Sequence, residues 1–199
     1  MRILAFSDLH LAQARAADLV AASAEADLVI GAGDFCNMRH GLDEAMTMLS
    51  GLAGPVVIIP GNAESAEELR EAAPVSAIVL HGEGTSVGGL HIFGLGYGIP
   101  ETPFGDWSCD LSEAAARTYL NRCSKVDIMV THSPPKGVAD RTSAGQSVGS
   151  VAVHEAILRL QPALAFCGHI HDSWRDRGRI GQTEVANLGP FVNWFEVPA

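Results

Sequence analysis

Positive charge is scarce in this sequence, and lysine almost absent. Only two of the 13 basic residues are lysines (Lys125 and Lys136), against 23 aspartates and glutamates, and the formal net charge is −10. This balance argues against non-specific binding to nucleic acid or to anionic membranes, because both need a basic surface. A metal centre would still make one cleft locally positive.

Cysteine pairs are also missing. The chain has four cysteines, at Cys36, Cys109, Cys123 and Cys167. None stands in a C-x-x-C pair, and they are too few for a disulfide framework, which favours reduced thiols and a cytoplasmic protein. Cys36 and Cys167 are best interpreted as small buried apolar residues.

Long apolar runs are lacking too. No run of 18 apolar residues is present, so no membrane span is expected. The apolar run at the N-terminus is too short for a signal peptide, and Asp8 and His10 interrupt it. With 199 residues, 47% of them hydrophobic and 18% charged, the chain suits one globular domain over residues 1–199.

Apolar runs alternate with helical patterns in the first half of the chain. Strands are predicted over 2–6, 28–30 and 56–59, and helices over 13–26, 43–52 and 65–73. The last of these helices opens on Ser65-Ala66-Glu67-Glu68, a capping-box pattern. This alternation predicts a largely parallel sheet with helices packed on it.

The second half is richer in glycine and in short strands. Hairpin strands are predicted over 78–80, 85–87 and 90–93, strands over 126–131 and 163–167, helices over 112–123 and 151–160, and closing antiparallel strands over 183–186 and 194–197. A long Gly/Pro segment, Gly94–Cys109, carries Tyr97, Phe104 and Trp107. Such a loop is either functional or an Ω-loop packed on its own aromatic residues.

The stretch Ala165-Phe166-Cys167-Gly168-His169-Ile170-His171 places two histidines just after a predicted strand. Gly168 ends the strand, and a turn at this point lets both imidazoles converge on one place. One such histidine is usually a core residue with its hydrogen bonds satisfied. Two histidines in this position indicate a metal site.

The other polar motifs share that position, each just past a predicted strand. The candidate ligands are Asp8, His10, Asp34, Asn62, His132, His169 and His171. In open α/β sheets, ligands bind outside the carboxyl ends of the strands. Oxygen and nitrogen ligands without a thiolate suit two divalent transition metal ions, Mn²⁺, Fe²⁺/Fe³⁺ or Zn²⁺. A bridging carboxylate would hold two such ions roughly 3.5–4 Å apart.

These motifs, Asp8-Leu9-His10, Gly33-Asp34, Gly61-Asn62, His132 and Gly168-His169-Ile170-His171, resemble the calcineurin-like metallophosphoesterases over essentially the whole chain. That family's pattern is D-x-H, G-D, G-N-H-[DE], H and G-H-x-H. The resemblance implies a four-layer α-β-β-α sandwich, an α/β fold of two mixed β-sheets flanked by helices. The compact size is similar to that of the small phosphodiesterase branch.

The resemblance also implies how the ligands divide between two metals. The first metal would be held by Asp8, His10, Asp34 and His171. The second would be held by Asp34, Asn62, His132 and His169, with Asp34 as the bridge. The expected activity is hydrolysis of a P–O bond by attack of a metal-bridging hydroxide, on a small phosphodiester or nucleotide-like substrate.

One departure matters. The third motif reads Gly61-Asn62-Ala63-Glu64, so alanine stands where the family has the histidine thought to protonate the leaving oxygen. Positioned general acids contribute ~10²–10⁴-fold, so substrates that need little protonation would suffer least. We hypothesise that the substrate is a phosphodiester and that His40 partly replaces the missing acid. The alternative for His40 is an exposed loop histidine.

Other residues near the motifs carry two interpretations each. Asn37 is either near the phosphate or a turn-forming residue, and Arg39 is either a phosphate ligand or a solvated side chain. In the family the residue at Glu64 orients the histidine missing here, and the simpler account is a charge at a helix N-terminus. Phe104 and Trp107 would stack on a base or an aromatic leaving group.

Three functions compete. A dinuclear metal phosphodiesterase leads, because all seven ligands are present while only the helper histidine is missing. A metal-binding protein-interaction scaffold of the same fold would explain the lost histidine but not the retained ligands. A phosphomonoesterase is the third, disfavoured because alkyl monoesters need the missing acid most.

Overall fold

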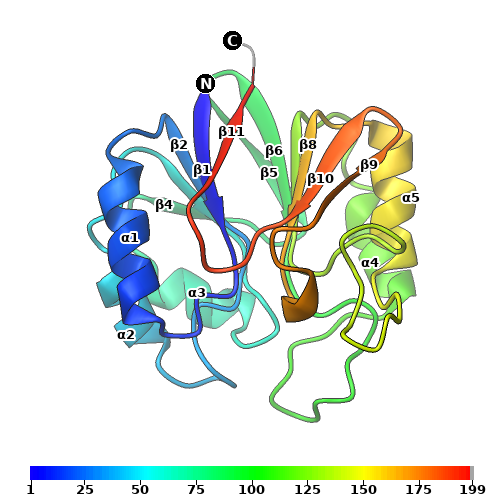
Figure 1. Ribbon diagram of the computed structural model, residues 1–199, viewed down its shortest axis with the longest axis horizontal. Helices are drawn as coiled ribbons and strands as arrows, with labels where there is room; N and C mark the ends of the chain where they lie inside the picture. Colours follow the sequence, from blue (N-terminus) through cyan, green and yellow to red (C-terminus); the bar gives the residue numbers. More distant parts are fainter. Residues whose placement is uncertain (198–199) are drawn as a thin grey trace.

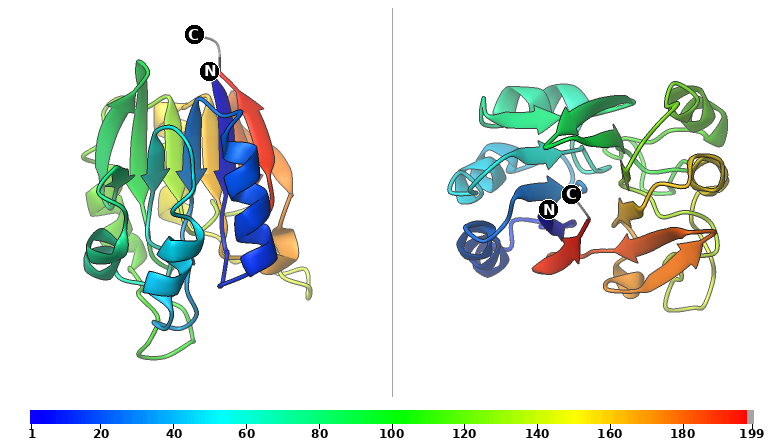
Figure 2. Two further views of the ribbon diagram at one scale, coloured as in Figure 1. Left: turned by 90° about the vertical axis from the view of Figure 1, so that its left-hand side faces the viewer. Right: turned by 90° about the horizontal axis from the view of Figure 1, so that it is seen from above.

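The computed structural model describes residues 1–197 as two β-sheets that face each other, each covered on its outer side by helices (Figure 1). Seen from above, helices α1 to α3 lie outside one sheet and helices α4 and α5 outside the other (Figure 2). This arrangement confirms the four-layer α-β-β-α sandwich with two mixed sheets. In the described range no helix has the length and apolar character that crossing a membrane requires.

The first sheet is built by the N-terminal half and one C-terminal strand, in the order β11-β1-β2-β3-β4. Its members are β1 (Arg2–Phe6), β2 (Leu28–Gly31), β3 (Val56–Ile58), β4 (Ala77–Val79) and β11 (Asn193–Glu196). Strands β1 to β4 are parallel, and β11 pairs antiparallel with β1. Its helices are α1 (Gln13–Ser23), α2 (Leu42–Met48) and α3 (Ala66–Ala72).

The second sheet has the order β5-β6-β7-β8-β10-β9. Its members are β5 (Glu83–Val87), β6 (Leu90–Leu95), β7 (Ile128–Thr131), β8 (Leu164–Cys167), β9 (Arg177–Ile180) and β10 (Thr183–Asn187), with helices α4 (Glu113–Leu120) and α5 (Val151–Leu160) and the short 3₁₀ helix η1 (His171–Ser173). The four central strands are parallel, and β5 and β9 are antiparallel edges.

Three strand predictions need correction here. The hairpin strand predicted over 78–80 is β4, which pairs parallel with β3 in the first sheet instead of forming a hairpin. Strand β9 was not predicted, and the predicted closing strand 183–186 is antiparallel only to β9, because it pairs parallel with β8. The reason is the β9–β10 hairpin, which turns at Gly181 (φ 60°) and inserts β10 between β8 and β9. The other closing strand does pair antiparallel with its neighbour, as predicted.

The central core fills the space between the two sheets. Ile30 and Ile59 from the first half meet Val130 and Phe166 from the second, all nearly inaccessible to solvent. The Phe166 ring lies 4.5 Å from that of Phe195, centroid to centroid. Parallel strands with helices outside and a second sheet inside are buried on both faces, which is why these strands read as uninterrupted apolar runs.

Helix starts follow the sequence signals more closely than helix ends. Ser65 caps α3 in a complete capping box with Glu68, as predicted, and α5 has the predicted bounds. The helix predicted over 43–52 ends at Met48, and the one predicted over 13–26 ends at Ser23.

The chain crosses from one sheet to the other between β4 and β5, and His81 lies in this crossing. Its ring packs 4.2 Å from that of Tyr97 and 5.4 Å from that of Tyr119, so it joins the crossing to the loop after β6 and to α4. Its Nδ1 atom is buried and has no hydrogen-bond partner among the described residues. Burial, with a smaller effect of Arg70, lowers the pKa of His81 to about 4.

This burial predicts acid sensitivity. The unfolded chain takes up a proton at His81 near its ordinary pKa of 6.5, whereas the folded protein resists protonation until about pH 4. Above pH 6.5 His81 is neutral in both states and does not reduce the free energy of unfolding. As the pH falls from 6.5 toward 4, protonation of His81 in the unfolded chain lowers that free energy progressively. We expect His81→Phe to reduce the loss of unfolding free energy between pH 7 and pH 4.5 by about 1–2 kcal/mol. Urea unfolding at both pH values measures this; an identical loss in both proteins would contradict it.

Candidate metal centre

The seven predicted ligands lie at one edge of the sandwich, where β1, β2, β3, β7 and β8 end. The first sheet supplies Asp8, His10, Asp34 and Asn62, and the second supplies His132, His169 and His171. Loops from the two sheets meet at this edge, at the bottom of Figure 1. The carboxyl edge of both sheets is thus the place where the motifs converge, as the sequence predicted from strand ends.

One group of ligand atoms forms around His10. Its Nε2 atom lies 3.2 Å from Nε2 of His171 and 3.5 Å from Oδ2 of Asp34. Nε2 of His171 lies 3.9 Å from Oδ1 of Asp8. Ligand atoms of Asp8, His10 and His171 all lie within 4.8 Å of one another, which is compact enough for a shared cation.

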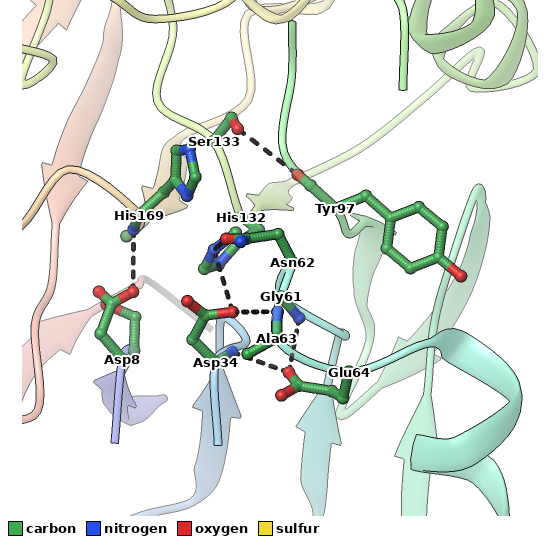
Figure 3. A network of polar contacts seen from close by, with 12 residues as sticks. Asp8, Asp34, Gly61, Asn62, Ala63, Glu64, Tyr97, His132, Ser133 and His169 are labelled. Carbon is green, nitrogen blue, oxygen red and sulfur yellow. Dashed lines mark hydrogen bonds and ion pairs between the residues drawn. The ribbon is translucent and has the colours of Figure 1, made fainter. Parts of the chain in front are cut away.

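A second group forms around His132, which is completely buried. Its Nε2 atom lies 3.4 Å from Oδ1 of Asp34 and 3.1 Å from Oδ1 of Asn62. The rings of His132 and His169 are 5.0 Å apart (Figure 3). Asp8 reaches this side as well, since ligand atoms of Asp8, Asp34 and His132 also lie within 4.8 Å of one another.

Asp34 links the two groups. Its side chain is only 7% exposed, with Oδ2 toward His10 and Oδ1 toward His132. A carboxylate with one oxygen on each side is what a bridging ligand requires, and the surrounding imidazole, carboxylate and amide atoms are suitable ligands for first-row divalent ions. The residues therefore fit a pair of such ions.

The backbone at the site is unusual. Four of the seven residues have positive φ angles, at Asp8 (52°), His10 (45°), Asp34 (57°) and His169 (68°). Non-glycine residues rarely adopt this conformation, and such strain concentrates at functional sites.

Gly61 shows how closely the ligand loops approach one another. A Cβ atom at this position would lie 2.0 Å from Oδ1 of Asp34 and 2.3 Å from its backbone nitrogen. Only glycine lets the loop after β3 pass this close to the loop after β2.

Glu64 fastens these two loops together. It is fully buried, and its Oε1 atom accepts hydrogen bonds from the backbone N–H groups of Asp34 (2.8 Å) and Gly61 (2.7 Å), while Oε2 accepts one from Phe35 (3.2 Å). Burial and the Asp34 carboxylate raise the pKa of Glu64 to about 7. Glu64 is therefore a positioning residue for Asp34, and neither sequence interpretation of it described this contact.

Asp8 has a support of its own. Ser7 Oγ and Trp174 Nε1 both donate to its Oδ2 atom, at 2.5 and 3.0 Å, and the N–H of His169 donates to Oδ1 at 2.9 Å. The Trp174 ring also packs 4.4 Å from that of His171. Sequence analysis missed Trp174; its position three residues after His171 was the available signal.

Asp34 and His132 shift each other's pKa values in opposite directions. Burial raises the pKa of Asp34, but the neighbouring His132 and His10 lower it by more, so the net shift is downward. Burial lowers the pKa of His132, but Asp34 raises it by more, to about 9. The two shifts agree that Asp34 and His132 form an ion pair. Burial, with the charge of His132, lowers the pKa of His169 to about 4.

The remaining candidates lie outside the two groups. His40 is exposed and joins Asn37 in a tight turn, and its ring makes no hydrogen bond to any described residue. Asn37 Nδ2 donates to the carbonyl of His10 at 3.4 Å. Arg39 binds both oxygens of Glu68, at 3.0 and 2.7 Å. Ala63 is buried, and its N–H donates to Asp34 Oδ1 at 2.8 Å.

Comparison with known families supports this geometry. The family described as the calcineurin-like phosphoesterase superfamily domain matches residues 1–197. The chain belongs to this superfamily. Calcineurin-like phosphoesterases use a dinuclear divalent metal centre, so this member is a metal-dependent phosphoesterase in general terms. No curated protein matches the sequence significantly.

Solved structures share the fold at low sequence identity. The protein TT1561 of Thermus thermophilus superposes with a TM-score of 0.74 at 17% identity, over 94% of this chain and 88% of that one. A dimetal phosphatase from Danio rerio superposes with a TM-score of 0.60 at 12% identity, over 96% of this chain and 88% of that one. The purple acid phosphatase PPD1 from yellow lupin (Lupinus luteus) seeds superposes with a TM-score of 0.62 at 12% identity, over 100% of this chain and 46% of that one.

Glu64 provides a test of how the site is positioned. Glu64→Gln places an amide group against backbone N–H donors, so we expect it to lower the free energy of unfolding by about 1–3 kcal/mol and to weaken Mn²⁺ binding roughly 10–100-fold. Urea unfolding and calorimetric titration measure the two effects. The matched control is Glu67→Gln, since Glu67 is exposed on α3. Equal behaviour of the two variants would contradict the positioning role.

Proposed function

We propose that this protein is a dinuclear metal phosphodiesterase that hydrolyses a small phosphodiester or nucleotide-like substrate. The observation that carries the proposal is the position of Asp34, whose two carboxylate oxygens face two separate groups of ligand atoms. Two-metal sites hold both the attacking and the leaving oxygen of an in-line displacement, and a bridging carboxylate sets their spacing.

The division of ligands is part of the proposal. Asp8, His10, Asp34 and His171 would hold one ion, and Asp34, Asn62, His132 and His169 the other. When bound, two divalent ions lower the pKa of water and polarise the phosphoryl group, which supplies a nucleophile at neutral pH. The protein's own residues keep this site in place: Glu64 holds the Asp34 loop, and Ser7 and Trp174 hold Asp8.

The alanine at position 63 favours a phosphodiester over a phosphomonoester as the substrate. It is buried, and its methyl group offers no proton to a leaving oxygen. Without a positioned acid, substrates with stabilised leaving groups or strained cyclic diesters are favoured over alkyl monoesters. The second candidate function is a metal-binding protein-interaction scaffold, and the same alanine supports it because a scaffold needs no acid. The retained set of seven candidate ligands favours catalysis instead.

Compartment and domain organisation are proposals as well. We propose a cytoplasmic protein, which the four free cysteines support. We also propose that residues 1–199 act as one metallophosphoesterase domain, which the family match over residues 1–197 supports.

Removing the bridge tests the function. Protein loaded with Mn²⁺ is assayed on bis(4-nitrophenyl) phosphate, on 4-nitrophenyl phosphate, and on 2′,3′- and 3′,5′-cyclic nucleotides. We expect bis(4-nitrophenyl) phosphate to be turned over fastest. Asp34→Asn should lower that turnover at least ~10³-fold, because the variant loses the negative charge that both metal positions would share. The control is Asp172→Asn, an exposed carboxylate beside His171. Metal binding without turnover of any substrate would favour the scaffold instead.

A second test concerns the proton that the leaving oxygen takes up. If His40 acts as a relay to the leaving oxygen, its effect is greatest for poor leaving groups, which need protonation most. We therefore expect His40→Ala to slow hydrolysis of an unstrained dinucleoside phosphate, whose leaving group is an alkoxide, about 10–100-fold and to leave the 4-nitrophenyl diester within about twofold of wild type. Unchanged rates on both substrates would assign His40 to the exposed turn alone.

A further inference from the structure

The loop between β6 and α4 presents an aromatic surface beside the candidate metal centre. Phe104 and Trp107 stack with their ring planes 5° apart and their centroids 5.6 Å apart. Phe104 is nevertheless 50% exposed, among the most exposed large apolar side chains in the described structure. Half of Phe104 thus stays open to solvent although its ring stacks with that of Trp107.

This surface lies against the second group of ligands. The Phe104 ring packs edge-on against that of His169, with centroids 6.3 Å apart and planes at 62°. The same loop holds Asn62 from two sides: Asn62 Nδ2 donates to Ser108 Oγ at 3.0 Å, and the N–H of Cys109 donates to the Asn62 carbonyl at 2.9 Å. A group bound at the metals is therefore within reach of the Phe104 ring.

The loop is held in place without burying Phe104. Asp110 Oδ2 accepts hydrogen bonds from the N–H and the hydroxyl of Thr102, at 2.9 and 2.8 Å, and Asp110 Oδ1 accepts one from Ser108 at 2.9 Å. An Ω-loop that served only to pack its own aromatic residues would enclose them. Here polar contacts fix the loop, and Phe104 stays half exposed to solvent.

We propose that the Phe104–Trp107 pair is a stacking platform for an aromatic group carried by the phosphoester, such as a nucleobase or an aryl group. The proposal rests on the proposed function, because the metals would hold the phosphoryl group next to the platform. Stacking on an aromatic side chain tolerates any planar ring, so the platform selects aromatic over alkyl esters and does not choose among bases.

The test compares two inert ligands that share one phosphoryl head. Binding of phenylphosphonate and of methylphosphonate to the Mn²⁺-loaded protein is measured by calorimetry. We expect wild type to bind phenylphosphonate ~5–20-fold more tightly, the low end of what base stacking contributes. Phe104→Leu keeps the apolar bulk and should reduce this ratio below about threefold. Phe104→Tyr keeps the ring and should preserve it. Methylphosphonate affinity should stay constant in all three proteins, which also shows that the site has folded.

The outcomes separate the platform from the activity. A ratio near one in wild type, or an unchanged ratio in Phe104→Leu, overturns the platform. If the diester is then still hydrolysed in an Asp34-dependent manner, the proposed function stands without it. If neither phosphonate binds and no substrate is turned over, the platform and the proposed function both fail.

Discussion

The buried carboxylate of Asp34 is the contact on which the site depends. It meets His10 from the first sheet on one side and His132 from the second sheet on the other. These two sheets share no strand, so the site exists only because the sandwich closes and brings the two carboxyl edges together. Burying a carboxylate is expensive unless it is paired and hydrogen-bonded. Here the histidines and the N–H of Ala63 meet that requirement.

Much of the supporting structure follows from keeping that carboxylate in place. Gly61 allows the loop after β3 to pass beside it, and Glu64 then ties the loop to the backbone of Asp34. Burial and, after it, the nearby Asp34 carboxylate both raise the pKa of Glu64, so two buried carboxylates this close carry an electrostatic cost. Cations at the site relieve that repulsion. The repulsion between these two buried carboxylates and the fit of the site to divalent ions are thus two aspects of one arrangement.

The sequence allowed the convergence of the candidate ligands at one edge to be predicted, but not the contacts that support them. His132 and Asn62 could be placed because parallel strands end at a common edge, and the fold class followed from the motif resemblance. Ser65 gave the start of α3 because capping is a local signal. Glu64 and Trp174 could not be assigned, since their roles depend on how loops far apart in sequence approach each other. The order of β9 and β10 depends likewise on a hairpin whose insertion no local pattern encodes.

The positive φ angles at four of the candidate ligand residues have a consequence for the thermodynamics of metal binding. Each such residue costs on the order of 1–3 kcal/mol, and the folded protein already bears this cost before any cation arrives. The loops therefore need little reordering when an ion binds, and the conformational entropy of the site is lost at folding rather than at binding. Ordering of the loops at the site therefore subtracts little from the free energy of binding a cation there.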